Sequence, residues 1–240
     1  MEAVEKTGRP EGMAAQSACF VAIDFDGTVT DVDIIDAVLQ DFARPEWREV
    51  ETLWEQGIIG SRECLERQMA MVEQPLGRLL EYVDGFSIDE TFGDFLRFLS
   101  RQSIPYAVVS DGFQVFIERL LANAGLTQVP VLANVLSEEG GRLKTFFPYA
   151  DPDCGSANCK CMATAVPGRE CSIILVGDGR SDFCLAHKAA HVFSKKKLTE
   201  YCRAHEIPHT AFHNFTEIKA VLEKKPLFAS PLSLVSARKD

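Results

Sequence analysis

Three short apolar runs constrain the fold of this chain more than any other feature, because each one stops at a cluster of polar residues. The runs span 19–25, 105–109 and 172–176. Uninterrupted apolar runs of this length are typical of strands buried on both faces of a sheet. Helical patterns separate the later runs, and strands joined through helices pair in parallel. The sequence therefore predicts an α/β fold with a doubly wound parallel sheet.

The stretch from residue 31 to residue 83 interrupts this alternation. It has the apolar spacing of helices and no convincing strand, with breaks at Pro45, Gly57 and Pro75. We expect a small all-helical cap here, inserted after the first strand, with helices over 32–43, 45–56, 61–73 and 76–83. The chain then divides into a flexible leader (1–17), an α/β core (18–30 and 84–225), the helical cap (31–83) and a tail that we do not assign (226–240).

Beyond residue 84 strands and helices alternate again. The turn sequence Glu139-Gly140-Gly141 between two strand-like runs predicts a hairpin over 129–147, followed by a loop over 151–161. Two further short strands are expected near 190–193 and 209–212. Helices are expected over 88–102, 113–124, 181–189, 197–205 and 215–224.

Charge and composition exclude several classes of protein. The 240 residues include 25 Lys+Arg and 35 Asp+Glu, a formal net charge of −10, which does not favour nucleic acid or an anionic membrane as a partner. We find no secretory signal and no apolar run long enough to span a bilayer, so we expect a cytoplasmic protein. The Lys195-Lys196-Lys197 run is expected to be a solvated helix start.

The polar residues at the strand ends include four acids. Asp24 and Asp26 are two residues apart and share one side of an extended chain, while Asp178 and Asp182 have a spacing that suits one helix face. The carboxyl ends of parallel strands meet at one sheet edge, where α/β proteins bind ligands. Carboxylates this close repel one another unless a cation lies between them. Each acid alone is readily a helix cap or turn residue, but the four together predict a Mg²⁺ site.

These residues resemble the signature motifs of the haloacid dehalogenase-like superfamily. The run Asp24-Phe25-Asp26-Gly27-Thr28 matches the first motif, Ser110 the second and Gly177-Asp178 with Asp182 the fourth, in the family's order. The resemblance covers roughly residues 18–215 and implies a Rossmann-like core with a helical cap. Because the second acid of the first motif is present, it implies a phosphatase, with a phosphotransferase or mutase as the weaker alternative.

The resemblance also implies a role for each acid. Asp24 would attack phosphorus and form an aspartyl-phosphate, and Asp26 would protonate the leaving oxygen and then activate water. Mg²⁺ would be held by the Asp24 carboxylate, the backbone carbonyl of Asp26 and Asp178. Asp182 would support the metal site or the family lysine, and Thr28 would help to orient the site.

The phosphoryl group would be bound by residues after the second run and by the family lysine. Ser110 would hydrogen-bond a phosphoryl oxygen, assisted by backbone N–H groups near Gly112, and Asp111 is included among the substrate-binding candidates. The lysine is either Lys144 or Lys160. Similar phosphatases carry it in a Cys-Lys loop, which favours Lys160 as the group that neutralises phosphate charge and keeps the nucleophile ionised. The plain alternative is a surface lysine.

The cap supplies the candidates for substrate recognition. Asp33 lies nine residues after Asp24, and in the similar phosphoserine phosphatases an acid at this spacing meets the substrate from the cap. Arg67 aligns with an arginine that binds the substrate carboxylate in those enzymes, and Arg62 is the alternative for this role. The run from Asp24 to Thr30 followed by Asp33, the Cys-Lys loop and the fourth motif resemble most the group of methionine-salvage phosphatases that act on 2-hydroxy-3-keto-5-methylthiopentenyl-1-phosphate. Phosphoserine and phosphocholine or phosphoethanolamine remain alternative substrates. The alternative for either arginine is that it is a solvated helix residue with no role in substrate binding.

Three cysteines, Cys154, Cys159 and Cys161, lie around the candidate lysine. Their spacing is unusual for zinc and no fourth ligand is evident, so we expect reduced cysteines that pack the loop. Two other classes of function stay open at this point. One is a non-catalytic protein that senses phosphate or metal, and the other is a redox or zinc module built on these cysteines.

Overall fold

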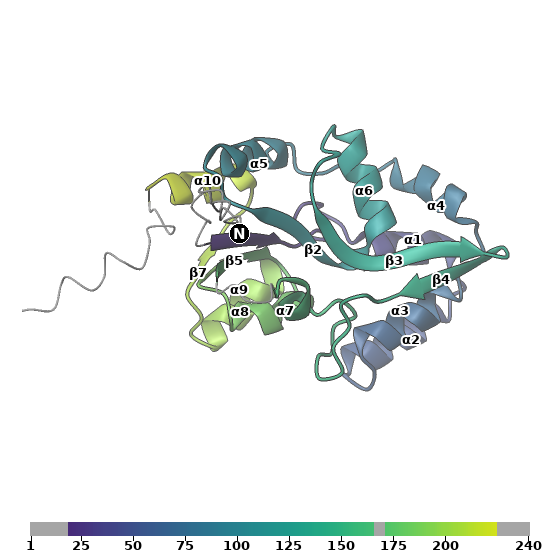
Figure 1. The fold of residues 1–240 in the computed structure, drawn as a ribbon. Coiled ribbons are helices and arrows are strands. Elements are labelled where there is room, and N and C mark those ends of the chain that lie inside the picture. The colour runs from purple at the N-terminus through teal and green to yellow at the C-terminus, as the bar shows by residue number, and fades with distance from the viewer. Residues whose placement is uncertain (1–18, 166–170, 225–240) are drawn as a thin grey trace, which may run out of the picture.

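The computed structural model describes residues 19–165 and 171–224, so the predicted leader (1–17) and tail (226–240) lie outside the described residues. At its centre is one seven-stranded sheet in the order β4-β3-β2-β1-β5-β6-β7 (Figure 1). Neighbouring strands pair in parallel, except β3 with β4. The predicted doubly wound sheet is confirmed. Its strands are β1 (Cys19–Ile23), β2 (Tyr106–Phe113), β3 (Val131–Glu139), β4 (Arg142–Phe146), β5 (Ser172–Gly177), β6 (His191–Ser194) and β7 (His209–Ala211).

The central position of β1 brings the three polar segments together. β1 pairs with β2 on one side and β5 on the other, and Ile23 is in register with Val108 and Val176. The backbone N–H of Asp24 still donates to the Val176 carbonyl, at 2.8 Å, so the ladder continues up to the first acid. The carboxyl ends of β1, β2 and β5 therefore form one edge, as the sequence predicted.

Helices cover both faces of the sheet (Figure 1). On one face lie α5 (Phe92–Arg101), α6 (Gln114–Asn123) and α10 (Phe215–Lys224), and on the other α7 (Lys160–Ala163), α8 (Phe183–Ala186) and α9 (Lys196–Ala204). Side chains alternate between the two faces: Ile23 and Val108 belong to one hydrophobic cluster, Ala22 and Val109 to the other. Among the described helices, none combines the length and the apolar character needed to cross a bilayer.

Four consecutive helices follow β1, which confirms the predicted helical insertion. They are α1 (Ile34–Phe42), α2 (Trp47–Glu55), α3 (Ser61–Met69) and α4 (Leu76–Val83). α3 is shorter than predicted because the chain leaves the helix after Met69 and Val72 forms an antiparallel bridge with Ala43. Buried residues of the insert, among them Val38 and Leu79, belong to the same hydrophobic cluster as Ile23 of β1.

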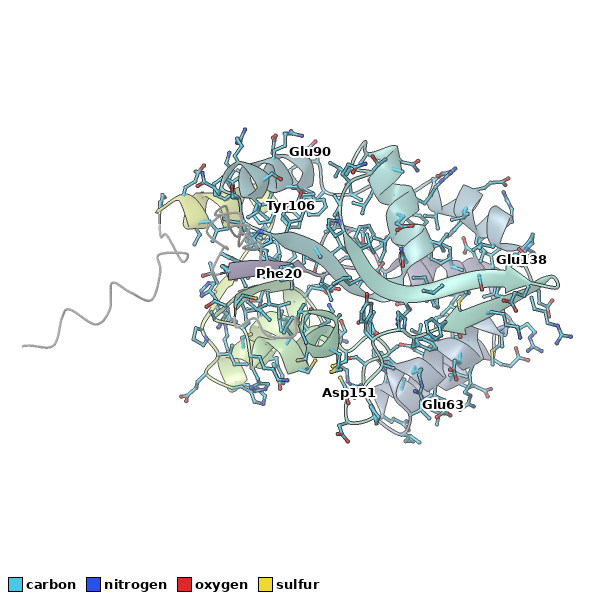
Figure 2. The ribbon with its side chains drawn as sticks, viewed as in Figure 1. Phe20, Glu63, Glu90, Tyr106, Glu138 and Asp151 are labelled. Carbon is cyan, nitrogen blue, oxygen red and sulfur yellow. The ribbon has the colours of Figure 1, made fainter. Side chains whose placement is uncertain are left out.

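The predicted hairpin forms and extends beyond the rest of the sheet. β3 pairs with β2 only through Asn134, and its remaining length pairs with β4. Gly140 and Gly141, with φ of 59° and 73°, make the tight turn, where residues with a Cβ are disfavoured. Figure 2 shows Glu138 near the tip, where its carboxylate accepts the backbone N–H of Leu76 at 2.8 Å. The hairpin thus connects the sheet to the insert.

Phe215 anchors α10 against α5, and its removal tests this packing. The ring is fully buried, with centroids 4.9 Å from that of Phe92 and 5.4 Å from that of Phe95. We expect Phe215→Ala to lower the free energy of unfolding by about 3–5 kcal/mol in urea denaturation, because it leaves a cavity. Phe146→Ala, at a side chain that is 64% exposed on β4, is the matched control. Equal losses in the two variants would contradict the packing described.

Candidate active site

The second polar segment lies within β2 rather than after it. The strand was expected to end at Val109, but it continues to Phe113 with a shift in register between these two residues. Within the shifted segment, the backbone N–H of Gly112 donates to Ser110 Oγ at 2.9 Å. A Cβ at Gly112 would lie 2.5 Å from Asp26 Oδ2 and 3.1 Å from Ser110 Oγ, so any larger residue here would displace these side chains. The irregular strand therefore directs Ser110 and the Gly112 backbone toward the first motif.

Lys160 forms the centre of the site. Its ammonium lies 2.6 Å from Asp24 Oδ1 and 2.6 Å from Asp182 Oδ1, and its side chain is fully buried. It begins the single-turn helix α7. Lys144, the other candidate, lies on β4 and is exposed. The structure therefore brings Lys160 between the carboxylates of two motifs.

Asp24, Lys160 and Asp182 are close enough for their charges to shift the pKa values of Asp24 and Lys160. Burial raises the pKa of Asp24, the Asp182 carboxylate raises it further, and the nearby Lys160 ammonium lowers it. Burial alone would lower the pKa of Lys160, but Asp182 and Asp24 raise it above its ordinary value. The lysine is therefore held in its charged form and can neutralise one of two neighbouring carboxylates.

Both carboxylate oxygens of Asp182 accept hydrogen bonds within the site. While Oδ1 accepts from Lys160, Oδ2 accepts the backbone N–H groups of Asp178 and Gly179, each at 3.1 Å. These bonds close the turn after β5 and hold Asp178 at the sheet edge. The predicted helix over 181–189 is instead a short 3₁₀ turn (Arg180–Asp182) followed by α8.

The Asp26 carboxylate contacts the start of the helical insert and β2. Its Oδ1 accepts the Ile34 backbone N–H at 3.0 Å, and its Oδ2 lies 3.5 Å from Ser110 Oγ. Burial, followed by the charge of Asp33, raises the pKa of Asp26 to about 8. A carboxyl group with such a pKa carries a proton at neutral pH and can donate it, which is what a general acid requires.

Asp24, Asp178 and Asp182 offer carboxylate oxygens within 4.8 Å of one another. Asp178 packs closely against Gly27, where a Cβ would lie 2.2 Å from Asp178 Oδ2 and where φ is +73°. An all-oxygen donor set with excess negative charge fits a hard divalent cation. Lys196 was expected at a solvated helix start, and its side chain is half exposed. Its ammonium nevertheless lies 3.1 Å from Asp178 Oδ2, so it contacts one of the three carboxylates.

The remaining predicted residues lie around this centre. Thr28 is buried, and Asp33 is the N-cap of α1, accepting the Asp36 N–H at 3.0 Å. Arg62 and Arg67 are exposed on α3. Arg67 pairs there with Glu63 at 3.2 Å.

Asn158 is a functional candidate that the sequence analysis missed. This fully buried residue donates from Nδ2 to the carbonyls of Ser110 and Leu132, both at 2.7 Å, and its backbone N–H donates to Asp111 Oδ1 at 2.5 Å. It therefore ties the loop that carries Lys160 to the end of β2. The available signal was its position two residues before that lysine.

Arg180 is a second missed residue, and it joins the fourth motif to the insert. Its guanidinium donates to the Trp54 carbonyl at 3.1 Å and lies 5.2 Å from the centroid of the Trp54 ring. Nearby, the Ser61 backbone N–H donates to the Gly155 carbonyl at 2.8 Å. In Figure 2 the labelled residues Glu63 on α3 and Asp151 in the loop after β4 lie on this same side. These contacts hold α2 and α3 against the loops of the site.

The site thus consists of a buried carboxylate beside a buried lysine, at the carboxyl edge of a parallel sheet with a helical insertion, where α/β proteins bind ligands. The family model for haloacid dehalogenase-like hydrolases matches residues 21–187. The chain belongs to this family. The matched region contains the last three residues of β1, the whole helical insert, β2, Lys160 and the fourth motif.

Curated relatives and a solved structure agree with this assignment. The 2-hydroxy-3-keto-5-methylthiopentenyl-1-phosphate phosphatase of Brevibacillus brevis is 28% identical over 211 residues, which are 84% of this chain and 93% of that protein. The protein of the same name from Microcystis aeruginosa is 30% identical over 211 residues, covering 84% and 96%. A solved phospho-aspartyl intermediate analogue of phosphoserine phosphatase has a TM-score of 0.60 at 16% identity, over 84% of this chain and 97% of that chain, and so shares the fold.

Removing the Lys160 charge tests the electrostatic centre without any assay of activity. In Lys160→Met, Asp24 and Asp182 would share a buried environment without their cation, so we expect the free energy of unfolding to fall by about 3–5 kcal/mol in urea denaturation. Lys144→Met, at an exposed position on β4, is the matched control and should change it little. A Lys160→Met protein as stable as this control would rule out the charge pairing described.

Proposed function

We propose that the chain is a Mg²⁺-dependent phosphomonoester hydrolase acting on a small phosphorylated metabolite through an aspartyl-phosphate on Asp24. The observation that carries this proposal is the pairing of Asp24 Oδ1 with the Lys160 ammonium at 2.6 Å. This contact leaves Oδ2 as the oxygen available for attack. Membership of the hydrolase family and the phosphatase names of its relatives support the reaction class.

In the proposed first step, Asp24 Oδ2 attacks phosphorus and the bond from phosphorus to the ester oxygen breaks. The proton held by Asp26 passes to that oxygen, so the alcohol leaves in neutral form. In the second step, Asp26 takes a proton from water, the water oxygen attacks phosphorus, and the bond to Asp24 breaks. Inorganic phosphate leaves and both carboxyl groups return to their starting states.

The metal proposal rests on the donor set. The carboxylates of Asp24 and Asp178 and the backbone carbonyl of Asp26 would hold Mg²⁺, whose charge would offset that of the phosphoryl oxygens. Asp182 would support the site through Lys160 and the backbone of the fourth motif, and Thr28 through its buried position in the first.

The phosphoryl oxygens would be bound by Ser110 Oγ, which the Gly112 backbone N–H holds in place, assisted by backbone N–H groups near Gly112. Asp111 would hold the adjoining loop through Asn158. Lys160 would neutralise part of the phosphoryl charge during transfer.

The substrate would meet the insert as well as the core. Asp33 is exposed at the start of α1, and the next residue, Ile34, donates its backbone N–H to Asp26 Oδ1 at 3.0 Å, so we place Asp33 beside the proposed general acid. Arg62 or Arg67 would read a polar group of the substrate. The Arg67 ion pair is solvent-exposed and weakly bound, so it can be exchanged for a ligand.

For the substrate we propose 2-hydroxy-3-keto-5-methylthiopentenyl-1-phosphate, which is in the names of both relatives compared above. Phosphoserine and phosphocholine or phosphoethanolamine are the competing substrates. A cytoplasmic location, where such metabolites occur, belongs to the same proposal.

A screen of phosphorylated metabolites with and without Mg²⁺ tests this function. We expect Mg²⁺-stimulated release of phosphate, with the highest kcat/KM for the methylthiopentenyl ester, and no release above background in Asp24→Asn. Asp153→Asn, at an exposed loop position, is the matched control and should retain full activity.

Two results would contradict the proposal in different ways. Undiminished turnover by Asp24→Asn would exclude Asp24 as the nucleophile. No stimulated activity on any ester of the panel, in a folded protein, would instead support a non-catalytic phosphate- or metal-binding role. A higher kcat/KM for phosphoserine or phosphocholine would correct the substrate and leave the reaction class unchanged.

A further inference from the structure

Four of the eight cysteines form a cluster outside the proposed catalytic centre. The Sγ atoms of Cys154, Cys159 and Cys184 all lie within 4.8 Å of one another. Cys161 is not one of these three, but Cys161 and Cys184 shift each other's pKa, so their thiols are neighbours. The sequence showed three of these residues and no fourth ligand. The fourth, Cys184, comes from α8, more than twenty residues further along the chain and on the same face of the sheet.

We propose that these four thiolates bind a structural Zn²⁺ ion. A zinc ion with four cysteine ligands is tetrahedral, with Zn–S bonds of about 2.3 Å and sulfur atoms about 3.8 Å apart. Three thiols already within 4.8 Å need only small side-chain rotations to reach this geometry. Cys161, the neighbour of Cys184, would be the fourth ligand, so the cluster has the number and the type of ligands that close a structural zinc site.

A disulfide accounts for the cluster less well. One disulfide joins two sulfurs, whereas the Sγ atoms of Cys154, Cys159 and Cys184 all lie within 4.8 Å of one another and Cys161 neighbours Cys184. No single pairing explains why all four thiols lie together. A single metal ion bound by all four thiolates would account for it.

The surroundings suit thiolates. Zinc binding would release the four thiol protons and leave two excess negative charges at the site. Lys188 lies four residues after Cys184, and the nearby Cys161 raises the pKa of its ammonium. Its ammonium would offset part of that charge. Cys159 is buried and the other three thiols are half-buried, so water has limited access to the cluster.

The site would also position the proposed catalytic lysine. Lys160 lies between Cys159 and Cys161, and Asp182 lies two residues before Cys184. A bound zinc would therefore fasten the loop that carries Lys160 to the segment that carries its carboxylate partner. The zinc site itself does not depend on the proposed hydrolase function, because it would exist in a non-catalytic protein as well.

Metal analysis of the full-length protein, purified without added zinc or chelator, tests the proposal. We expect one zinc per chain by elemental analysis. After replacement of zinc by Co²⁺, we expect the intense near-ultraviolet thiolate-to-cobalt absorption and the strong visible bands of a tetrahedral thiolate site. Cys184→Ser should lose the zinc and this absorption, whereas Cys171→Ser, outside the cluster, should retain both.

The measurements on the unmodified chain keep the test valid if Cys184→Ser fails to fold. Absence of zinc, together with no cobalt–thiolate absorption when Co²⁺ is supplied to the reduced protein, would overturn the proposal. A disulfide would also overturn it. In freshly purified protein, a disulfide would appear as a mass lower than that of the reduced protein by two hydrogen atoms for each cysteine pair. Equal zinc content in Cys184→Ser and the wild type would place the metal elsewhere.

Discussion

The Lys160 ammonium between Asp24 and Asp182 is the interaction on which the rest of the site depends. Buried charges are costly unless they are paired, and here one cation serves two carboxylates from different strands. The pairing requires the central position of β1 beside β5, the turn closed by Asp182, and the loop that Asn158 ties to β2. The remaining negative charge at the sheet edge is the physical reason to expect a divalent cation. A chain with a formal charge of −10 can then accept an anionic ester.

The insert and the sheet are parts of one packed structure. A single hydrophobic cluster runs from β1 through the helices of the insert, and the β3–β4 hairpin continues the sheet out to it. Arg180 joins the fourth motif to Trp54 of α2, and the backbone of Ser61 bonds to Gly155. The loops that would bind phosphate are therefore covered by the helices proposed to contact the rest of the substrate. Such a cover can exclude water from a phosphorylated intermediate.

Much of this arrangement could be predicted from the sequence because its signals are local. Apolar runs that stop at acids predicted the strands and the shared edge, and the break in alternation predicted the helical insertion. The bulged path of β2 through Ser110 could not be predicted, since it depends on the close approach of Gly112 to Asp26. Asn158, Arg180 and Cys184 were not predicted because their contacts join segments that are far apart in the sequence. No spacing of residues along the chain indicates such contacts.

Trapping of the proposed intermediate tests the central claim most directly, because borohydride reduces an aspartyl-phosphate to homoserine. The protein would be treated with borohydride during turnover of its best ester, and the peptide containing Asp24 would be analysed by mass spectrometry. The account predicts homoserine at Asp24, only when substrate is present. Continued turnover with Asp24 unmodified, or modification at a different carboxylate, would contradict it.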